Sequence, residues 1–368
     1  MYEWVVIGAG FAGSVLAERI ATVRGERVLL VDRRSHLGGN AHDRHDEHGI
    51  LVHEYGPHIF HTNAASVFDY LSQWTHWRPY EHRVLSHVNG RYLPFPINLD
   101  TINALYDLDL DVSGMERFIE ARREAVKDVR SAKDHFLATV GRELYEIFFE
   151  GYTRKAWGID AADLDKSVAS RIPLRMSRDD RYFSDRFQQM PINGYSAMFL
   201  RMTDHPKIDF ALDTDWAELK HSRIRFRRLV FTGPIDSYFN YRFGPLPYRS
   251  LEFRRVTLET RQFQLAAVVN YPGSEPYLRV TEHKHLTGQI HRKTTLTYEY
   301  PAVQGPPFYP IPRRANHQKY LRYREVARRT PDVWFVGRLA TYRYYNMDQV
   351  VAQALKTFAR INAAVGRT

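Results

Sequence analysis

The chain has 368 residues, 44% of them hydrophobic and 26% charged, which are the proportions of globular proteins and exclude extensive disorder. It contains no cysteine, so disulfides, thiolate zinc sites and a cysteine nucleophile are excluded as well. Its 52 lysines and arginines outnumber its 42 aspartates and glutamates, and the resulting net charge of +10 favours an anionic partner. Because no nucleic-acid motif accompanies this charge, we expect an anionic metabolite and no nucleic acid.

The opening segment predicts neither a membrane span nor a secretory signal. Residues 4–17 form the longest uncharged apolar stretch near the start, which is too short and too rich in glycine to cross a bilayer. The residue before it is the acidic Glu3, whereas a secretory signal begins with basic residues. We therefore expect a cytoplasmic protein with no membrane contact, and the length predicts two or three folding units.

Residues 5–32 have the pattern of a dinucleotide-binding unit. A short apolar strand over 5–7 is followed by the glycine loop 8–13, a helix over 14–23 and a second strand over 27–31 that ends at Asp32. The order strand, glycine loop, helix, strand and acid is the complete context in which this motif binds a dinucleotide.

Each residue of the motif has its own task. Gly8 permits a tight turn, Gly10 lets the backbone approach a pyrophosphate, and Gly13 lets the helix pack closely on the strand. The helix N-terminus then faces the phosphates, and Asp32 accepts hydrogen bonds from ribose hydroxyls.

The middle of the chain predicts two further units. Residues 99–171 are poor in glycine and proline and indicate helices, with long ones over 114–130 and 132–150. Strand-like runs separated by glycine and proline then occupy 229–231, 265–269, 278–280 and 294–300.

The end of the chain resembles its beginning, with a strand over 333–336, then Gly337, a loop and a helix over 348–365. We therefore predict an α/β fold: a Rossmann-like nucleotide-binding domain with an inserted helical domain and an antiparallel β-sheet domain. The expected bounds are 1–80, 193–222 and 331–368 for the nucleotide-binding domain, 99–171 for the helical domain, and 81–98, 172–192 and 223–330 for the antiparallel sheet domain.

A second glycine pair favours FAD over NAD. Gly38 and Gly39 follow the second strand closely, so another backbone segment can approach the same pyrophosphate, an arrangement commoner in amine-oxidase and GDP-dissociation-inhibitor types of FAD protein than in NAD dehydrogenases. A helix beginning near Asp348 would direct its positive N-terminus at the pyrimidine ring of the flavin. An ordinary capped helix that closes the sheet is the alternative reading of that segment.

Four segments in order along the chain resemble the bacterial UDP-galactopyranose mutase family: YGPHIFHTN (55–63), FFEGYTRKAWG (148–158), FTGPID (231–236) and YYNMDQ (344–349). The resemblance implies an isomerase that interconverts UDP-galactopyranose and UDP-galactofuranose without net redox change, through covalent catalysis by N5 of reduced FAD. It also implies UDP as a ligand, a role in galactofuranose supply for cell-surface polysaccharide, no metal, and a homo-oligomer, dimer or higher.

The family's site residues transfer to this chain position by position. The catalytic residues implied are Arg171, Arg279 and His61, with the two arginines holding the diphosphate through bidentate hydrogen bonds. The substrate-binding residues implied are Phe148, Phe149, Tyr152, Thr153, Trp157, Tyr182, Phe183, Asn270, Tyr309 and Tyr344. The cofactor-binding residues implied are Gly8, Gly10, Phe11, Gly13, Asp32, Arg33, Gly39, Asn40, His58, Gly337, Arg338, Met347, Asp348 and Gln349.

Some assignments keep alternatives. Arg175 and Arg178 lie near Arg171 in the sequence, and His58 competes with His61 as the important histidine. The aromatic stripe of the helical domain is also compatible with a buried core face. The two arginines are also compatible with a solvated surface. Asn346 departs from the family, because many members have an acidic residue there.

The roles of two segments and the functional class of the protein stay open. The polar stretch 177–181 is compatible with a mobile loop carrying Arg171. The arginine-rich run 223–228 matches no catalytic segment of the family and indicates one solvated face of a strand. A flavin oxidoreductase of the amine-oxidase type and a nucleotide-binding module without catalysis are the rival functional classes.

Overall fold

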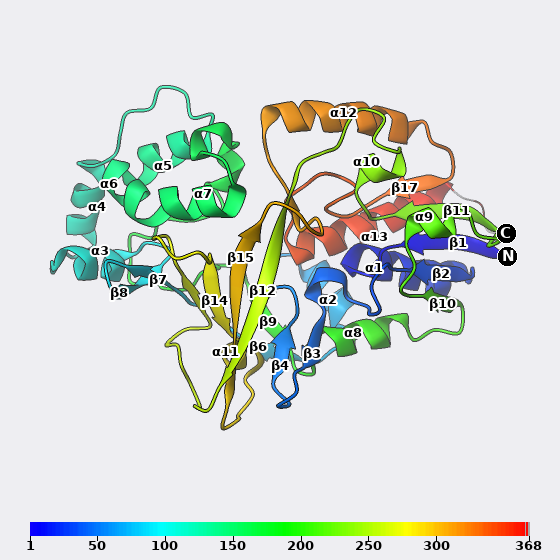
Figure 1. Cartoon of the computed structure of the whole chain (residues 1–368), viewed down its shortest axis with the longest axis horizontal. Helices are drawn as coiled ribbons and strands as arrows, with labels where there is room; N and C mark the ends of the chain where they lie inside the picture. The colour runs from blue at the N-terminus through cyan, green and yellow to red at the C-terminus, as the bar shows by residue number, and fades with distance from the viewer. Residues whose placement is uncertain (365, 367–368) are drawn as a thin grey trace.

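Strand β1 (Tyr2–Ile7) lies at the centre of a five-stranded parallel sheet with the order β10-β2-β1-β11-β17. Its neighbours are β2 (Val28–Val31) and β11 (Phe226–Phe231), and the edges are β10 (Ile208–Ala211) and β17 (Val333–Phe335). In the computed structural model, which describes residues 1–364 and 366, this sheet combines strands from the start, middle and end of the chain (Figure 1). The apolar β1 and β2 are buried on both faces, as parallel strands require.

Helix α1 (Phe11–Arg19) follows β1 and lies beside α13 (Met347–Ala364) along this sheet (Figure 1). The helix predicted over 14–23 begins earlier, at Phe11, and ends in a π-helical turn, Ile20–Arg24. Helix α13 begins one residue before the predicted start, and the predicted end at residue 365 lies outside the described residues. The two ends of the chain therefore meet in one Rossmann-like unit.

The assignment of residues 223–330 to the antiparallel sheet is wrong at its start, because β11 is hydrogen-bonded to β1 and β17 in the parallel sheet. A short apolar run buried on both faces does not indicate which sheet it joins. The arginine-rich run also lies only partly in this strand. Arg223 and Arg225 precede it, and Arg228 is half-buried over the ring of Trp4.

The helical group lies on the opposite side of the molecule (Figure 1). It contains α3 (Leu99–Tyr106), α4 (Val112–Glu120), α5 (Ala132–Val140), α6 (Arg142–Tyr145), the π-helical turn Glu146–Glu150 and α7 (Gly151–Trp157).

The long helices predicted in this group are shorter than expected. The prediction over 114–130 is wrong beyond Glu120, because the following residues form a loop whose Glu124 N–H bonds to the carbonyl of Leu137 on α5. The prediction over 132–150 is wrong at Gly141, which ends α5 with φ +81°. A Cβ at Gly141 would lie 2.1 Å from the carbonyl oxygen of Arg122, so tertiary contact requires glycine here.

A seven-stranded sheet with the order β16-β12-β15-β14-β13-β7-β8 joins the two groups, and its long strands β12 and β15 cross the middle of Figure 1. All its pairs are antiparallel except β13 with β7. Its members are β7 (Val84–Val88), β8 (Arg91–Phe95), β12 (Tyr248–Leu258), β13 (Val268–Asn270), β14 (Arg279–Glu282), β15 (Thr294–Ala302) and β16 (Tyr309–Pro310).

The strand predicted over 265–269 begins only at Val268, because Gln264 and its neighbours form a loop held by the carboxylate of Glu282. The remaining α-helices and strands are β3 (Asp43–His45), β4 (Leu51–His53), β5 (Phe60–Thr62), β6 (Trp77–Pro79), β9 (Phe187–Pro191), α2 (Ala65–Ser72), α8 (Gly194–Thr203), α9 (Trp216–Leu219), α10 (Ile235–Tyr238), α11 (His283–Thr287) and α12 (Arg314–Arg328). Within the described residues, no helix is long and apolar enough to span a bilayer.

Candidate active site

A cavity of about 2360 Å³ extends from the parallel sheet to the helical group. At one end it opens on the carboxyl ends of the parallel strands, where Gly8 follows β1, Asp32 follows β2 and Gly337 follows β17, the place where such sheets bind ligands. At the other end it reaches Trp157 on α7. Every residue predicted for the site lines this cavity except Gly13. A Cβ at Gly13 would lie 1.8 Å from the carbonyl oxygen of Gly8, so this glycine allows the close helix–strand packing.

Two glycine loops meet at the parallel-sheet end. Gly39 has φ +56°, and a Cβ on it would lie only 3.0 Å from Cα of Gly10, so the two backbones pack against each other and stay open to the cavity. The carboxylate of Asp32 accepts the N–H of Ala9 at 2.7 Å and the N–H of Arg34 at 2.9 Å, which holds the first loop in place. This cradle fits a pyrophosphate beside a helix N-terminus.

The N-terminus of α13 reaches the same cavity through Met347, Asp348 and Gln349. Thr62 donates to Oδ2 of Asp348 at 3.0 Å, while Oδ1 of Asp348 is buried without a hydrogen-bond partner among the described residues. The cavity thus offers a phosphate cradle and a second helix N-terminus to one long ligand, and these residues fit a dinucleotide such as FAD.

Arg279 lines the cavity, in a row of paired residues across three strands. Its neighbours in register are Asn270 on β13 and Glu299 on β15. Nε of Arg279 is 3.3 Å from Oε2 of Glu299, whose side chain is almost fully buried. Burial is the largest single influence and by itself would lower the pKa of Arg279, but Glu299 together with the nearby tyrosines Tyr152, Tyr182 and Tyr344 outweighs it and raises the pKa. Arg279 is therefore a fixed cation, and sequence reasoning missed Glu299 because only strand register identifies it.

Arg171 crosses the cavity mouth from the loop that follows the helical group. Its Nη1 donates to the carbonyl oxygen of Tyr344 at 2.8 Å, its Nη2 donates to Oδ1 of Asn346, and its Cζ lies 4.1 Å from the centroid of the Tyr344 ring. Asn346 therefore supplies an uncharged acceptor to this arginine.

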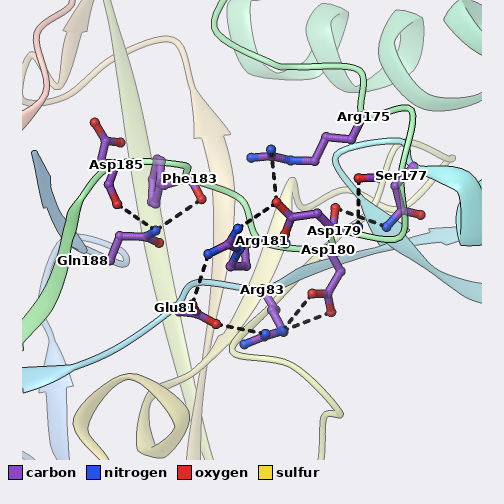
Figure 2. Close-up of polar contacts among 11 residues, drawn as sticks. Glu81, Arg83, Arg175, Ser177, Asp179, Asp180, Arg181, Phe183, Asp185 and Gln188 are labelled. Atoms are coloured by element: carbon purple, nitrogen blue, oxygen red, sulfur yellow. Dashed lines mark hydrogen bonds and ion pairs between the residues drawn. The ribbon is translucent and has the colours of Figure 1, made fainter. Parts of the chain in front are cut away.

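The neighbouring arginines are held differently. Arg175 lines the cavity and pairs with Asp179 at 3.4 Å, whereas Arg178 pairs with Asp100 outside the cavity lining (Figure 2 shows Arg175 and Asp179). Hydrogen bonds from Arg181 lower the pKa of Asp179 to about 2. The polar stretch 177–181 thus forms an ion-pair network.

Aromatic side chains surround the far end. Trp157 packs edge-on against Tyr309 at 5.1 Å and Tyr344 at 5.7 Å between ring centroids. Phe148 and Phe149 are buried and also line the cavity, so these two residues belong both to the hydrophobic core and to the cavity wall.

Tyrosines complete this part of the lining. Burial raises the pKa of Tyr152, Tyr182 and Tyr309, so their hydroxyls stay neutral at ordinary pH.

The two candidate histidines differ in their surroundings. The His58 ring bonds to the carbonyl of Gly56 at 2.9 Å, and burial lowers its pKa to about 3, so it is neutral. His61 pairs through Nδ1 with Oδ2 of Asp185 at 2.8 Å. Asp185 was not predicted from the sequence, where its only signal is its place just after Phe183. Among the described residues, no group of three or more His, Asp or Glu side chains is arranged to hold a metal.

Comparisons with known proteins agree with this geometry. A profile of the UDP-galactopyranose mutase family matches residues 147–344, and a profile of the NAD(P)-binding Rossmann-like domain matches residues 6–74. The chain is 37% identical over 360 residues to a probable UDP-galactopyranose mutase of Klebsiella pneumoniae, covering 96% of this chain and 93% of that protein. It is 34% identical over 367 residues to a dTDP-fucopyranose mutase of Escherichia coli, covering 97% of each.

A crystal structure of a reduced UDP-galactopyranose mutase has the same fold, with a TM-score of 0.80, 16% identity, and coverage of 100% of this chain and 95% of that one. The predicted fold class and the resemblance of the four sequence segments are both confirmed. The chain belongs to the UDP-galactopyranose mutase family.

Proposed function

We propose that this enzyme interconverts UDP-galactopyranose and UDP-galactofuranose, with no net oxidation or reduction, while holding reduced FAD. One observation carries the proposal: the same cavity contains a cradle for a dinucleotide, two arginines and a cluster of aromatic rings. A cofactor and a nucleotide sugar can therefore bind side by side.

The cofactor end fits FAD through several contacts. The backbone at Gly10 and Gly39 would hold the pyrophosphate, Asp32 a ribose, and the N-terminus of α13 the pyrimidine edge of the flavin. When bound, reduced FAD supplies the nucleophile of covalent catalysis through N5. The positive end of α13 favours the anionic form of the reduced ring.

The substrate end fits a nucleoside diphosphate. We assign the uracil to the aromatic group around Trp157 and the diphosphate to Arg171 and Arg279. As the bond between the anomeric carbon and UDP breaks, negative charge grows on the diphosphate, and the two guanidinium groups stabilise it. Arg171 has to exchange its two neutral acceptors for phosphate oxygens, whereas Arg279 is already in place beside Glu299.

The neutral tyrosines and Asn270 would orient the hexose and limit the access of water while the ring opens and closes. We further infer a cytoplasmic homo-oligomer, a dimer or higher, that supplies galactofuranose for cell-surface polysaccharide and binds no nucleic acid.

The test is chromatography of nucleotide sugars after incubation of the purified protein with UDP-galactofuranose. With dithionite in the absence of oxygen we expect conversion to UDP-galactopyranose and an unchanged redox state of the flavin after many turnovers. Air-oxidised protein should be inactive. Turnover without a reductant, or none with it, would overturn the proposal.

The similarity to the dTDP-fucopyranose mutase makes a dTDP-linked deoxyhexose the necessary competing substrate in this assay. A higher kcat/KM for the dTDP-sugar would overturn the assignment of base and sugar but leave the mutase chemistry in place. Oxygen consumption with an amine would instead identify an oxidase.

A further inference from the structure

His61 is held from two sides at the cavity wall. It lies on β5, which pairs with β9 so that His61 faces Gln188 in register, and Asp185 lies in the turn just before β9. Nδ1 of His61 is 2.8 Å from Oδ2 of Asp185, and the ring stacks on Phe183 with 3.6 Å between centroids and 13° between planes. The ring has therefore little freedom to rotate or flip.

A chain of hydrogen bonds determines which atom carries the proton. The N–H of Arg186 donates to Oδ1 of Asn63 at 2.9 Å, which orients the amide so that its Nδ2 donates to Oδ1 of Asp185 at 2.8 Å. An ionised carboxylate only accepts hydrogen bonds. Oδ2 of Asp185 therefore also accepts, and the donor opposite it is Nδ1–H of His61.

We propose that Asp185 is a positioning residue that holds His61 in the tautomer protonated at Nδ1, so that Nε2 presents a lone pair to the cavity. His61 lines the cavity, and within the described part of the chain no residue hydrogen-bonds to its Nε2. An Nε2 lone pair accepts a hydrogen bond from an O–H or N–H group. The identity of that group rests on the proposed function: a hydroxyl of the hexose or an N–H of the reduced flavin.

The same loop offers a matched control. The two carboxylate oxygens of Asp180 share the N–H of Arg83 Nε, at 2.9 and 3.0 Å (Figure 2), and Asp180 does not line the cavity. Asp180→Asn therefore removes a carboxylate from the loop without touching His61.

The turn itself does not depend on the side chain of Asp185. Nε2 of Gln188 donates to the backbone carbonyls of Phe183 and Asp185, at 3.3 and 3.1 Å, and Figure 2 shows both bonds. Variants at Asp185 should therefore fold. In Asp185→Asn, the two accepting carboxylate oxygens are replaced by one amide oxygen and one NH2 group. Either His61 or Asn63 then faces a donor instead of an acceptor.

The decisive measurement is the tautomer, by long-range nitrogen–proton NMR of the FAD-loaded protein labelled with ¹⁵N in histidine. The signals lost in His61→Gln identify His61. We expect a protonated Nδ1 in the wild type and in Asp180→Asn, and a mixture of tautomers in Asp185→Ala. A wild-type His61 protonated at Nε2, or an unchanged tautomer in Asp185→Ala, would overturn the proposal.

The NMR measurement of the tautomer needs no turnover. A failure of this proposal is therefore distinct from a failure of the proposed function, in which the wild type would not convert UDP-galactofuranose. Steady-state kinetics measure the consequence for catalysis. Because a charged hydrogen bond is lost, we expect kcat to fall by about ten- to hundredfold in Asp185→Asn and to stay unchanged in Asp180→Asn.

Two binding measurements on Asp185→Ala distinguish the donors. An altered flavin midpoint potential in the absence of sugar identifies the flavin N–H. Weaker binding of UDP-galactose with unchanged binding of UDP identifies the hexose.

Discussion

Arg171 and Tyr344, which are 173 positions apart in the sequence, are joined across the cavity mouth by a hydrogen bond of 2.8 Å and by stacking of the guanidinium on the ring. The acceptors of Arg171 in this arrangement, the Tyr344 carbonyl and the Asn346 amide, are both neutral. A diphosphate can displace neutral acceptors more easily than it can displace a carboxylate, because no ion pair has to be broken.

Arg279 and Arg171 should differ in how much they contribute to kcat/KM. Charged hydrogen bonds are worth about 1.5–3 kcal/mol, so Arg279→Ala should lower kcat/KM by about a hundredfold or more and Arg171→Ala by about tenfold. The larger loss at Arg279 follows from its fixed place beside Glu299. Lysine at either position keeps the charge but loses the planar fork, so rescue should be partial. Arg178→Ala is the control, and full activity of Arg279→Ala would contradict the assignment.

Asn346→Asp should weaken the binding of UDP. The new carboxylate would pair with Arg171, which is exposed, and an exposed ion pair is worth about 0–1 kcal/mol, so the Kd for UDP should rise by up to about fivefold. The difference from wild type should shrink at high salt. Titration calorimetry at low and high salt measures both effects, and tighter binding by the variant would refute this reading of Asn346.

Trp157→Phe should abolish most of the change in tryptophan emission on UDP binding, because Trp157 lies among the aromatic rings assigned to the uracil. Trp334→Phe is the control, since Trp334 packs against Trp4 and does not line the cavity. A fluorescence titration of both variants is sufficient. An undiminished signal in Trp157→Phe would place the uracil elsewhere.

Gly39→Ala should reduce the flavin content of the purified protein. Its Cβ would lie 3.0 Å from Cα of Gly10, which pushes the two glycine loops apart, in addition to strain at φ +56° of about 1–2 kcal/mol. Gly49→Ala separates the two effects, because Gly49 has φ +79° but no atom within 4 Å of the added Cβ. Absorbance at flavin wavelengths should fall only in Gly39→Ala, and equal loading of the two variants would count against the cradle.

Stability should decrease on mild acidification. Burial lowers the pKa of His53 to about 4 and that of His58 and His82 to about 3, so the folded chain keeps them neutral. The unfolded chain protonates them below about pH 6.5 and therefore binds more protons. The free energy of unfolding then falls from about pH 6.5 toward pH 4, by about 1.4 kcal/mol per pH unit for each histidine.

Urea unfolding at several pH values measures this slope. His82→Gln keeps an acceptor for the hydroxyl of Tyr80 and should reduce the slope by one histidine's share, whereas the exposed His221→Gln should leave it unchanged. A stability independent of pH in this range would contradict the prediction.

The helix predictions show where local reasoning ends. Residues 121–130 have good helix formers, yet α4 stops at Glu120, because the following backbone bonds to Leu137 on α5 instead of continuing its own helix. Likewise the apolar run 229–231 identifies a strand, but only pairing with β1 assigns it to the parallel sheet.

By itself, the sequence determined the dinucleotide-binding unit, because a strand, its glycines and its closing acid are neighbours within 32 residues and act through the local backbone. It also indicated the family, through four ordered segments that each lie within a few residues of chain. Only the tertiary structure decided that Asp185 meets His61, 124 positions away, and that Glu299 supports Arg279. Those partners are set by which strands pair and in which register, and register depends on burial of whole sheet faces rather than on the residues that pair.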